Sequence, residues 1–131
     1  MKVMVDTNVL FSAILFPGGQ AAKAFTHCLL QHELVIPTYV IDELKRVVAK
    51  KYPKNIAAID SFLEKLSFNL VYTPEKIEKE LFNIRDPKDY PVLYTAIVEN
   101  VDVLISGDND FTDTDITHPE IVSPKEFLEK Y

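Results

Sequence analysis

Short apolar runs alternate with longer helical patterns along this chain, and this alternation constrains the fold more than any other feature of the sequence. Runs rich in β-branched or aliphatic residues cover positions 3–5, 34–36 and 101–105, and a shorter run covers 70–72. Polar or turn residues bound each run, so we expect buried strands of a parallel sheet. The helical patterns between them cover residues 21–31, 39–52, 56–66, 75–82 and 89–99. This alternation of strand and helix predicts a doubly wound α/β domain.

Capping residues mark two of the helix starts. Thr73, Pro74 and Glu75 supply an N-cap, a proline at the first helical position and an acid in the first turn. Ser123 and Glu126 have the spacing of a capping box before a final short helix. No repeat, low-complexity tract or Gly/Ser linker interrupts the 131 residues. We therefore expect one domain over residues 1–131, which can bury about two thirds of its unfolded surface.

The composition argues against a membrane protein. The chain is 47% hydrophobic and 26% charged, which is typical of a soluble globular protein. No apolar stretch approaches the roughly 18 residues that a membrane helix needs. Asp6 and Asn8 interrupt the apolar run near the start, so we expect no signal peptide. A cytoplasmic location is the resulting expectation.

Cysteine and histidine do not provide a metal site in this sequence. Cys28 is the only cysteine, so neither an internal disulfide nor a zinc site built on cysteines can form, and we expect it to pack in the core. The histidines His27, His32 and His118 lack the spacing of a metal pair on one helix face. A metal site in this chain would have to use other residue types.

Acidic residues follow two of the expected strands. In an open parallel sheet, the carboxyl ends of the strands and the amino ends of the helices lie at one edge, where ligands bind. Asp6 directly follows the first strand, and Asp108 follows the 101–105 strand after Ser106 and Gly107. Both acids are therefore expected in the loops of that edge.

Two expected helices bring further acids to the same region. Glu43 lies at the border of the apolar stripe of its helix, whereas Asp42 projects away from that stripe. Asp89 shares a helix face with Val92 and Leu93, so it begins a buried stripe. A carboxylate in that position costs desolvation free energy unless it caps the helix or meets a cation.

The four acids together suggest a hard metal ion. Singly, Asp6, Asp89 and Asp108 can each be an N-cap or turn acid, and Glu43 can be a solvated helix acid. Four carboxylates converging on one edge would raise each other's pKa unless a divalent cation neutralised them. Ligands that offer only oxygen suit Mg²⁺ or Mn²⁺ better than zinc.

Other acid-rich or phosphate-binding motifs fit poorly. Counted from Asp108 as the start of a calcium-binding EF-hand loop, the sixth position is Asp113 instead of glycine and the twelfth is Pro119 instead of glutamate. A phosphatase of the haloacid dehalogenase type would have an acid where this chain has Asn8. The chain has three glycines and no glycine-rich phosphate loop.

Four segments give this sequence a family resemblance over nearly its whole length. They are "VMVDTNVLFSA" near the start, "VIDEL" around Glu43, "RDPKDYPVLYTA" in the middle and "VLISGDNDF" further on. The ordered set resembles the PIN-domain ribonucleases, in particular the toxins of type II toxin-antitoxin pairs. The resemblance implies a Rossmann-like, three-layer PIN fold with a central parallel sheet of four to five strands flanked by helices.

The resemblance also implies roles for individual residues. The residues that resemble the family's acidic, catalytic and metal-binding quartet are Asp6, Glu43, Asp89 and Asp108. Those that resemble or lie beside its supporting polar positions are Asn8, Asp86, Ser106 and Asp110. Many members have threonine at the position of Ser106, which keeps the hydroxyl. The implied activity is hydrolysis of RNA phosphodiester bonds with Mg²⁺ or Mn²⁺, in a homodimer that a protein antitoxin inhibits.

The net charge of −6 makes a purely electrostatic RNA-binding protein a poor fit, so local basic residues matter more. A basic stretch follows Glu43, and Lys88 lies beside Asp89. We expect RNA phosphates to contact this stretch, although it would also suit a solvated helix face. The candidate RNA-binding residues are Lys45, Arg46, Lys50 and Lys88, with Lys51 and Lys54 nearby.

Two other functions compete with a nuclease. One is a catalytically silent PIN-fold module that binds RNA or protein, and the complete set of carboxylates argues against it. The other is a phosphate-accepting receiver domain. That domain would need an acid pair on the first strand and an acceptor aspartate after a middle strand, whereas the 34–36 strand is followed by Pro37 and Thr38.

Overall fold

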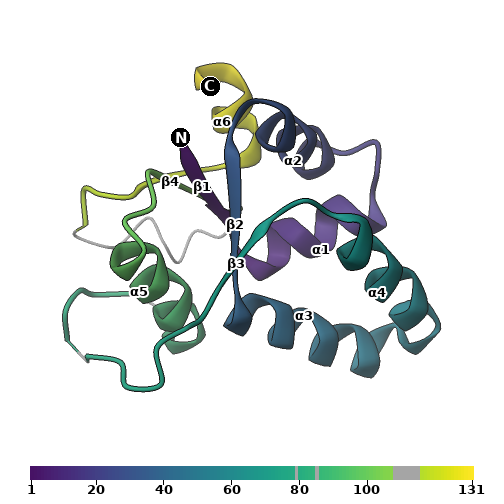
Figure 1. Cartoon of the computed structure of the whole chain (residues 1–131), viewed down its shortest axis with the longest axis horizontal. Coiled ribbons are helices and arrows are strands. Elements are labelled where there is room, and N and C mark those ends of the chain that lie inside the picture. The colour runs from purple at the N-terminus through teal and green to yellow at the C-terminus, as the bar shows by residue number, and fades with distance from the viewer. Residues whose placement is uncertain (79, 85, 108–115) are drawn as a thin grey trace.

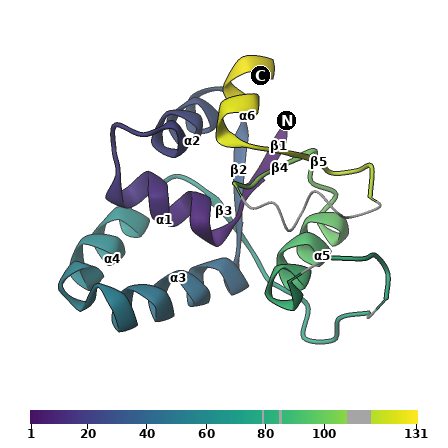
Figure 2. The same cartoon turned by 180° about the vertical axis from the view of Figure 1, so that it is seen from behind.

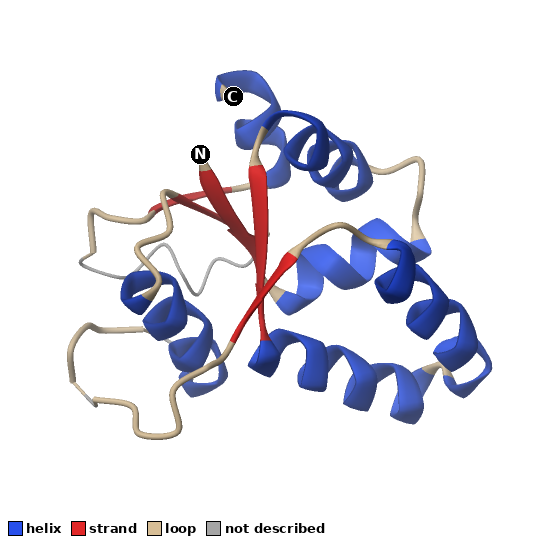
Figure 3. Ribbon diagram, viewed as in Figure 1, coloured by secondary structure: helices blue, strands red, loops and turns tan. Residues whose placement is uncertain are grey.

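A five-stranded parallel sheet forms the centre of the molecule (Figure 3). The computed structural model describes residues 1–78, 80–84, 86–107 and 116–131. The strand order is β3-β2-β1-β4-β5, and every neighbouring pair is parallel. The strands are β1 (Lys2–Val5), β2 (Glu33–Pro37), β3 (Asn69–Val71), β4 (Val103–Ile105) and β5 (Glu120–Val122). This confirms the predicted parallel sheet of four to five strands.

Helices cover both faces of this sheet. Figures 1 and 2 show α5 on one face and α1, α2 and α4 on the other, which gives the predicted three layers. The helices are α1 (Thr7–Leu15), α2 (Gln20–Gln31), α3 (Thr38–Lys51), α4 (Ile56–Lys65), α5 (Tyr90–Val98) and α6 (Pro124–Lys130), with 3-10 turns η1 (Pro53–Asn55) and η2 (Pro87–Asp89). Among the described residues, no helix has the length and apolar character needed to cross a membrane.

The core is formed where the central strands meet helices on both sides. Val3, Met4 and Val5 of β1 are fully buried, as expected for a parallel strand covered on both faces. Val3 pairs with Leu34 of β2 and Val103 of β4, so β1 is the middle of the sheet. The residues that follow the carboxyl end of β1 are therefore held in position by a fully buried central strand.

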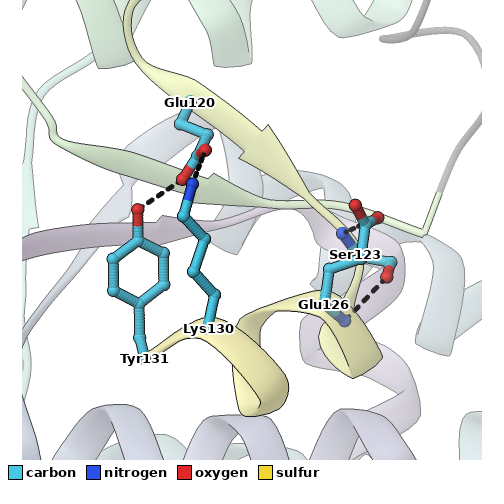
Figure 4. Close-up of polar contacts among 5 residues, drawn as sticks. All are labelled: Glu120, Ser123, Glu126, Lys130 and Tyr131. Atoms are coloured by element: carbon cyan, nitrogen blue, oxygen red, sulfur yellow. Dashed lines mark hydrogen bonds and ion pairs between the residues drawn. The ribbon is translucent and has the colours of Figure 1, made fainter.

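The carboxyl-terminal helix is capped as predicted. Ser123 Oγ accepts a hydrogen bond from the Glu126 N–H at 3.1 Å, and Glu126 Oε1 accepts one from the Ser123 N–H at 3.1 Å (Figure 4). Lys130 and the Tyr131 hydroxyl both contact the Glu120 carboxylate at the start of β5 (Figure 4). These contacts join α6 to the edge strand.

The helix predicted over residues 75–82 is wrong. The described residues of the segment between β3 and η2 form turns and bends and no helix. Thr73 does not cap a helix there. Its Oγ1 accepts a hydrogen bond from the Tyr39 N–H at 3.2 Å, and its N–H donates to Thr38 Oγ1 at 3.0 Å. Contacts with α3 therefore override the local helical pattern.

Two elements are absent from the sequence prediction. Helix α1 begins directly after Asp6, but its sequence is apolar on nearly every side, so it lacks the 3.6-residue pattern that identifies a surface helix. Strand β5 begins with Glu120 and has only two apolar residues, Ile121 and Val122, so no apolar run identifies it. The other predicted helices and strands are confirmed, with ends that differ by at most two residues.

Candidate functional site

Asp6 lies at the junction of β1 and α1, where it is 4% exposed. Its Oδ1 accepts a hydrogen bond from the Val9 N–H at 2.8 Å and thereby caps α1. Its Oδ2 accepts one from Ser106 Oγ at 2.5 Å. Ser106 follows β4, and its own N–H donates to the carbonyl of Val122 at 2.8 Å. The pairing of β1 with β4 thus brings together two residues that are 100 positions apart and that the sequence placed at the same edge.

A pocket of about 280 Å³ opens beside this junction. Glu43 reaches it from α3, Asp86 and Asp89 reach it from η2, and Asn8 reaches it from the first turn of α1. Asp86 Oδ1 also accepts a hydrogen bond from the Lys88 N–H at 3.0 Å, so it caps η2. Three acids from two segments therefore line one pocket, next to the end of β1.

Tyr39 lies close to two of these acids. Burial raises the pKa of its hydroxyl, the negative charges of Glu43 and Asp89 and a hydrogen bond with Glu43 raise it further, and Arg46 opposes the shift. The negative charges of Glu43 and Asp89 thus both act on the Tyr39 hydroxyl, although the two acids lie on different elements. The sequence analysis missed Tyr39. Its position four residues before Glu43, on the same helix face, was the available signal.

A basic pocket of about 460 Å³ adjoins the acidic one. Arg46 and Lys50 line it, and Lys51, Lys88 and Glu43 belong to both pockets. The two pockets therefore form a continuous surface in which cations border acids.

Lys45 lies elsewhere, although it directly precedes Arg46. It lines a different pocket with Asp60 and Glu64 of α4 and with Leu70 of β3. Adjacent residues on a helix point about 100° apart, which separates this lysine from the basic pocket. The structure thus gathers Arg46, Lys50 and Lys88 but not Lys45.

The chemistry of the donors suits a hard cation. Asp6, Glu43 and Asp89 offer carboxylate oxygens, the ligands preferred by Mg²⁺ and Mn²⁺. The predicted residues Asp108 and Asp110 lie outside the described residues. In the described ranges alone, no three His, Cys, Asp or Glu side chains are grouped closely enough to hold a metal ion. The described acids therefore match the ligand type, while the fourth member of the predicted quartet lies beyond them.

Cys28 lies in the core, and His27 and His32 lie at the end of the molecule opposite the acidic pocket. Cys28 is buried in the core, and burial raises the pKa of its thiol to about 12. His27 Nε2 is 2.8 Å from the carbonyl oxygen of Tyr131, and the rings of His27 and His32 both pack edge-on against Phe127. The two histidines and Phe127 form a contact between α2 and α6, and the burial of Cys28 confirms its predicted packing role.

Comparison with known proteins identifies the architecture. A family model described as "PIN domain" matches residues 2–110. No curated protein is significantly similar in sequence. VapBC2 from Rickettsia felis, solved with a DNA fragment from its promoter, is 22% identical, with a TM-score of 0.71 over 94% of this chain and 98% of that one.

Two further solved structures share the fold. FitAcB from Neisseria gonorrhoeae is 17% identical, with a TM-score of 0.67 over 94% of this chain and 98% of that one. VapC20 from Mycobacterium tuberculosis, described as a toxin that cleaves the sarcin-ricin loop, is 9% identical, with a TM-score of 0.60 over 84% of this chain and 92% of that one. At these identities, the likeness to solved structures concerns the fold.

Proposed function

This chain belongs to the PIN domain family, and we propose from that premise that it is a metal-dependent endoribonuclease that hydrolyses RNA phosphodiester bonds. The observation that carries the proposal is the convergence of acids at the carboxyl edge of the sheet. Asp6 directly follows β1, and Glu43 of α3 and Asp89 of η2 line the pocket beside that junction. Acids gathered at one edge of a sheet favour a counter-charge, which a divalent cation supplies.

We assign Mg²⁺ or Mn²⁺ to the carboxylates of Asp6, Glu43, Asp89 and Asp108. Asp108 directly follows Gly107 in the sequence, two positions after the Ser106 hydroxyl that contacts Asp6. The bound cation would act as a Lewis acid that activates water and neutralises charge on the phosphate. The chain's own contribution is orientation, because the Val9 N–H and the Ser106 hydroxyl each donate a hydrogen bond to one oxygen of the Asp6 carboxylate.

Supporting roles fall to polar residues around the acids. We propose that Asn8 and Asp86, which line the acidic pocket, and Ser106 keep the carboxylates in place. Asp110 remains a prediction from the sequence. Each of these would act through the acids and would not contact the RNA bond itself.

RNA would bind along the joined pockets. Arg46, Lys50 and Lys88 line the basic pocket, and Lys88 also borders the acids. Their charges favour phosphates next to the cleaved bond although the whole chain carries a net charge of −6. Lys45 belongs to another pocket, so we expect a smaller contribution from it.

The relatives suggest a biological setting. VapBC2 and FitAcB carry the fold of this chain, and VapC20 is described as a toxin that cleaves the sarcin-ricin loop. We propose that this protein is the toxin of a toxin-antitoxin pair, that it acts in the cytoplasm as a homodimer, and that a protein antitoxin inhibits it.

A second candidate is a catalytically silent PIN-fold module that binds RNA or protein. One observation favours it: the described acids alone do not form a group that could hold a metal ion. The two candidates make opposite predictions for RNA cleavage in the presence of a metal.

The test is cleavage of a labelled single-stranded RNA by purified protein with Mg²⁺ or Mn²⁺, alongside EDTA and the Asp6→Asn and Glu43→Gln variants. Asp42→Asn is the matched control, because Asp42 is the exposed neighbour of Glu43 on α3. We expect cleavage that needs metal, that both site variants lose and that Asp42→Asn retains. If the wild type, freed of any copurified protein, binds RNA but does not cleave it, the silent module replaces the nuclease.

A further inference from the structure

The segment between β3 and α5 forms an apolar pocket that the proposed chemistry does not use. Its volume is about 440 Å³. The apolar residues that line it are Ile77, Phe82, Ile84, Pro87, Tyr90 and Pro91. Glu80 and Asn83 are its polar residues. A surface of aromatic, proline and isoleucine side chains with two hydrogen-bonding groups is typical of a small-ligand site.

One side chain holds this segment in place. The Tyr90 hydroxyl donates a hydrogen bond to the Glu78 carbonyl at 2.5 Å and accepts one from the Leu81 N–H at 3.1 Å. The buried Phe82 ring stacks on the Tyr90 ring, with centroids 4.2 Å apart and planes 13° apart. Glu80 has a φ of 68°, a conformation that such contacts must maintain. The pocket is therefore built into the fold before any ligand binds.

The apolar pocket adjoins the acidic pocket through η2. Pro87 lines the apolar pocket, whereas Asp86, Lys88 and Asp89 line the acidic one. Consecutive residues are about 3.8 Å apart along the backbone, so the two pockets are separated by a single turn. A polymer whose phosphate lies at the acids could place its next unit in the apolar pocket.

We propose that this pocket binds an unpaired nucleobase of the RNA, immediately next to the bond that is cleaved. The inference rests on the proposed ribonuclease function. Single-stranded RNA is recognised by bases that turn outward, pack on aromatic or apolar side chains and hydrogen-bond along their edges. Here Tyr90 and the isoleucines offer the apolar surface, while the Glu80 carboxylate can accept hydrogen bonds.

Charge favours RNA over an apolar peptide as the occupant. Lys88 lies next to Pro87 and borders both the acidic and the basic pocket. A nucleotide combines an apolar-faced base with a phosphate, which matches an apolar pocket beside this lysine. The pocket would then determine which base is preferred near the cleavage position.

The experiment uses short single-stranded RNAs that carry 2-aminopurine at one position each, added to the full chain. The fluorescence of this base changes when it stacks, so it reports pocket entry without requiring cleavage. Ile84→Glu places a charge in the pocket, and Ile77→Ala trims its wall more mildly in case the first variant folds poorly. Leu81→Glu is the matched control, because Leu81 is exposed in the same segment and does not line the pocket.

We expect one RNA position to change its fluorescence with wild-type protein and with Leu81→Glu. Ile84→Glu should abolish that change and weaken RNA binding roughly 5- to 150-fold, the range for loss of one stacked base. Ile77→Ala should have the same effect to a smaller degree. In cleavage assays, KM should rise by a similar factor while kcat stays within about twofold, because the pocket does not touch the reacting phosphate.

The proposal is overturned if no position responds, if the protein binds no RNA, or if both pocket variants bind RNA as the wild type does. It is also overturned if Ile84→Glu leaves RNA binding intact but releases a bound protein partner, which would assign the pocket to that partner. Cleavage is read separately. RNA that binds with a responsive position but is not cleaved refutes the nuclease and keeps the base site, whereas cleavage without a responsive position refutes only the base site.

Discussion

The two edges of the sheet gather different kinds of polar residue. At the carboxyl edge, Glu43, Asp86 and Asp89 bring negative charges from two segments to one pocket. At the amino edge, near both chain ends in Figure 1, polar groups pair with one another. His27 there contacts the Tyr131 carbonyl, and the Tyr131 hydroxyl contacts Glu120.

From this difference and the proposed function, we predict that stability and activity depend on different ends of the molecule. Paired groups around a buried ring at the amino edge stabilise the fold. Like charges at the carboxyl edge repel one another, so their grouping is better explained by a ligand than by folding. Substitutions at the two edges should therefore separate cleavage from stability.

The largest effect is expected for Asp6→Asn, on cleavage. We expect the rate to fall roughly 10³- to 10⁴-fold, about 4–5.5 kcal/mol of transition-state free energy, because a neutral amide cannot replace a carboxylate ligand. The thermal midpoint should change little, since asparagine is an equally good helix N-cap. Single-turnover cleavage and thermal unfolding measure the two effects. Cleavage retained within tenfold would contradict the assignment of Asp6.

A companion variant, Asp6→Ala, sharpens this result. It should lose the same activity and, in addition, about 1 kcal/mol of the free energy of unfolding, because the Val9 N–H loses its capping partner. Equal stability of the alanine and asparagine variants would show that the cap contributes nothing.

Phe127→Ala tests the amino edge. Phe127 of α6 is fully buried and packs against the rings of His27 and His32. Truncation should lower the free energy of unfolding by about 3–5 kcal/mol, while cleavage per folded molecule stays at the wild-type level. Denaturant unfolding measures the loss. Less than 1 kcal/mol lost, or activity lost without unfolding, would break the proposed separation of the two edges.

A smaller effect distinguishes two neighbouring cations on α3. Arg46→Ala should weaken RNA binding several-fold and lower the slope of log K against log salt by about one, because Arg46 lines the basic pocket. Lys45→Ala should leave both quantities nearly unchanged, because Lys45 lines another pocket. A fluorescence anisotropy titration at several salt concentrations measures both. Equal effects of the two substitutions would instead indicate that RNA contacts the whole basic stretch, including Lys45.

The smallest effect concerns pH and the amino edge. Burial, the positive charge of the N-terminus and His27 lower the pKa of His32 below its ordinary value of 6.5. Neither of its ring nitrogens has a hydrogen-bond partner in the described part of the chain. The unfolded chain therefore takes up a proton at higher pH than the folded chain does.

The lowered pKa of His32 makes the free energy of unfolding fall as pH decreases. This contribution to stability is fully present above about pH 6.5 and is lost as pH falls through that value toward the folded pKa. Unfolding at a series of pH values from 7.5 to about 5 should show decreasing stability, with a shallower decrease for His32→Phe. An unchanged slope in that variant would remove His32 as the cause.

Much of the fold could be predicted from the sequence because its signals are local. The buried runs of β1 and β2 and the apolar stripe of α3 show their periods within a few residues. The rule that parallel strands end at one edge predicted that Asp6 and Asp108 lie in loops of that edge, and Ser106, which begins the second loop, contacts Asp6. The Ser123 capping box could be predicted for the same reason, because its two partners are three residues apart.

The misses were of a different kind. The 75–82 pattern looked helical, but Thr73 is held by α3 and Phe82 by Tyr90, so distant partners determine the conformation of that segment. Helix α1 has no polar face to mark it, because apolar residues occupy nearly all of its sides, including partly exposed ones. Such outcomes depend on contacts between remote segments, which no local window contains.

The sequence by itself determined which residue types this protein has for its chemistry and the edge of the sheet at which they would gather. Only the tertiary structure decided which of them share a pocket: Tyr39 beside Glu43, Arg46 without Lys45, and an apolar pocket on the other side of η2. The physical reason is that periodicity and capping depend on residues only a few positions apart in the sequence. The direction of a side chain toward another element is set by how the layers pack.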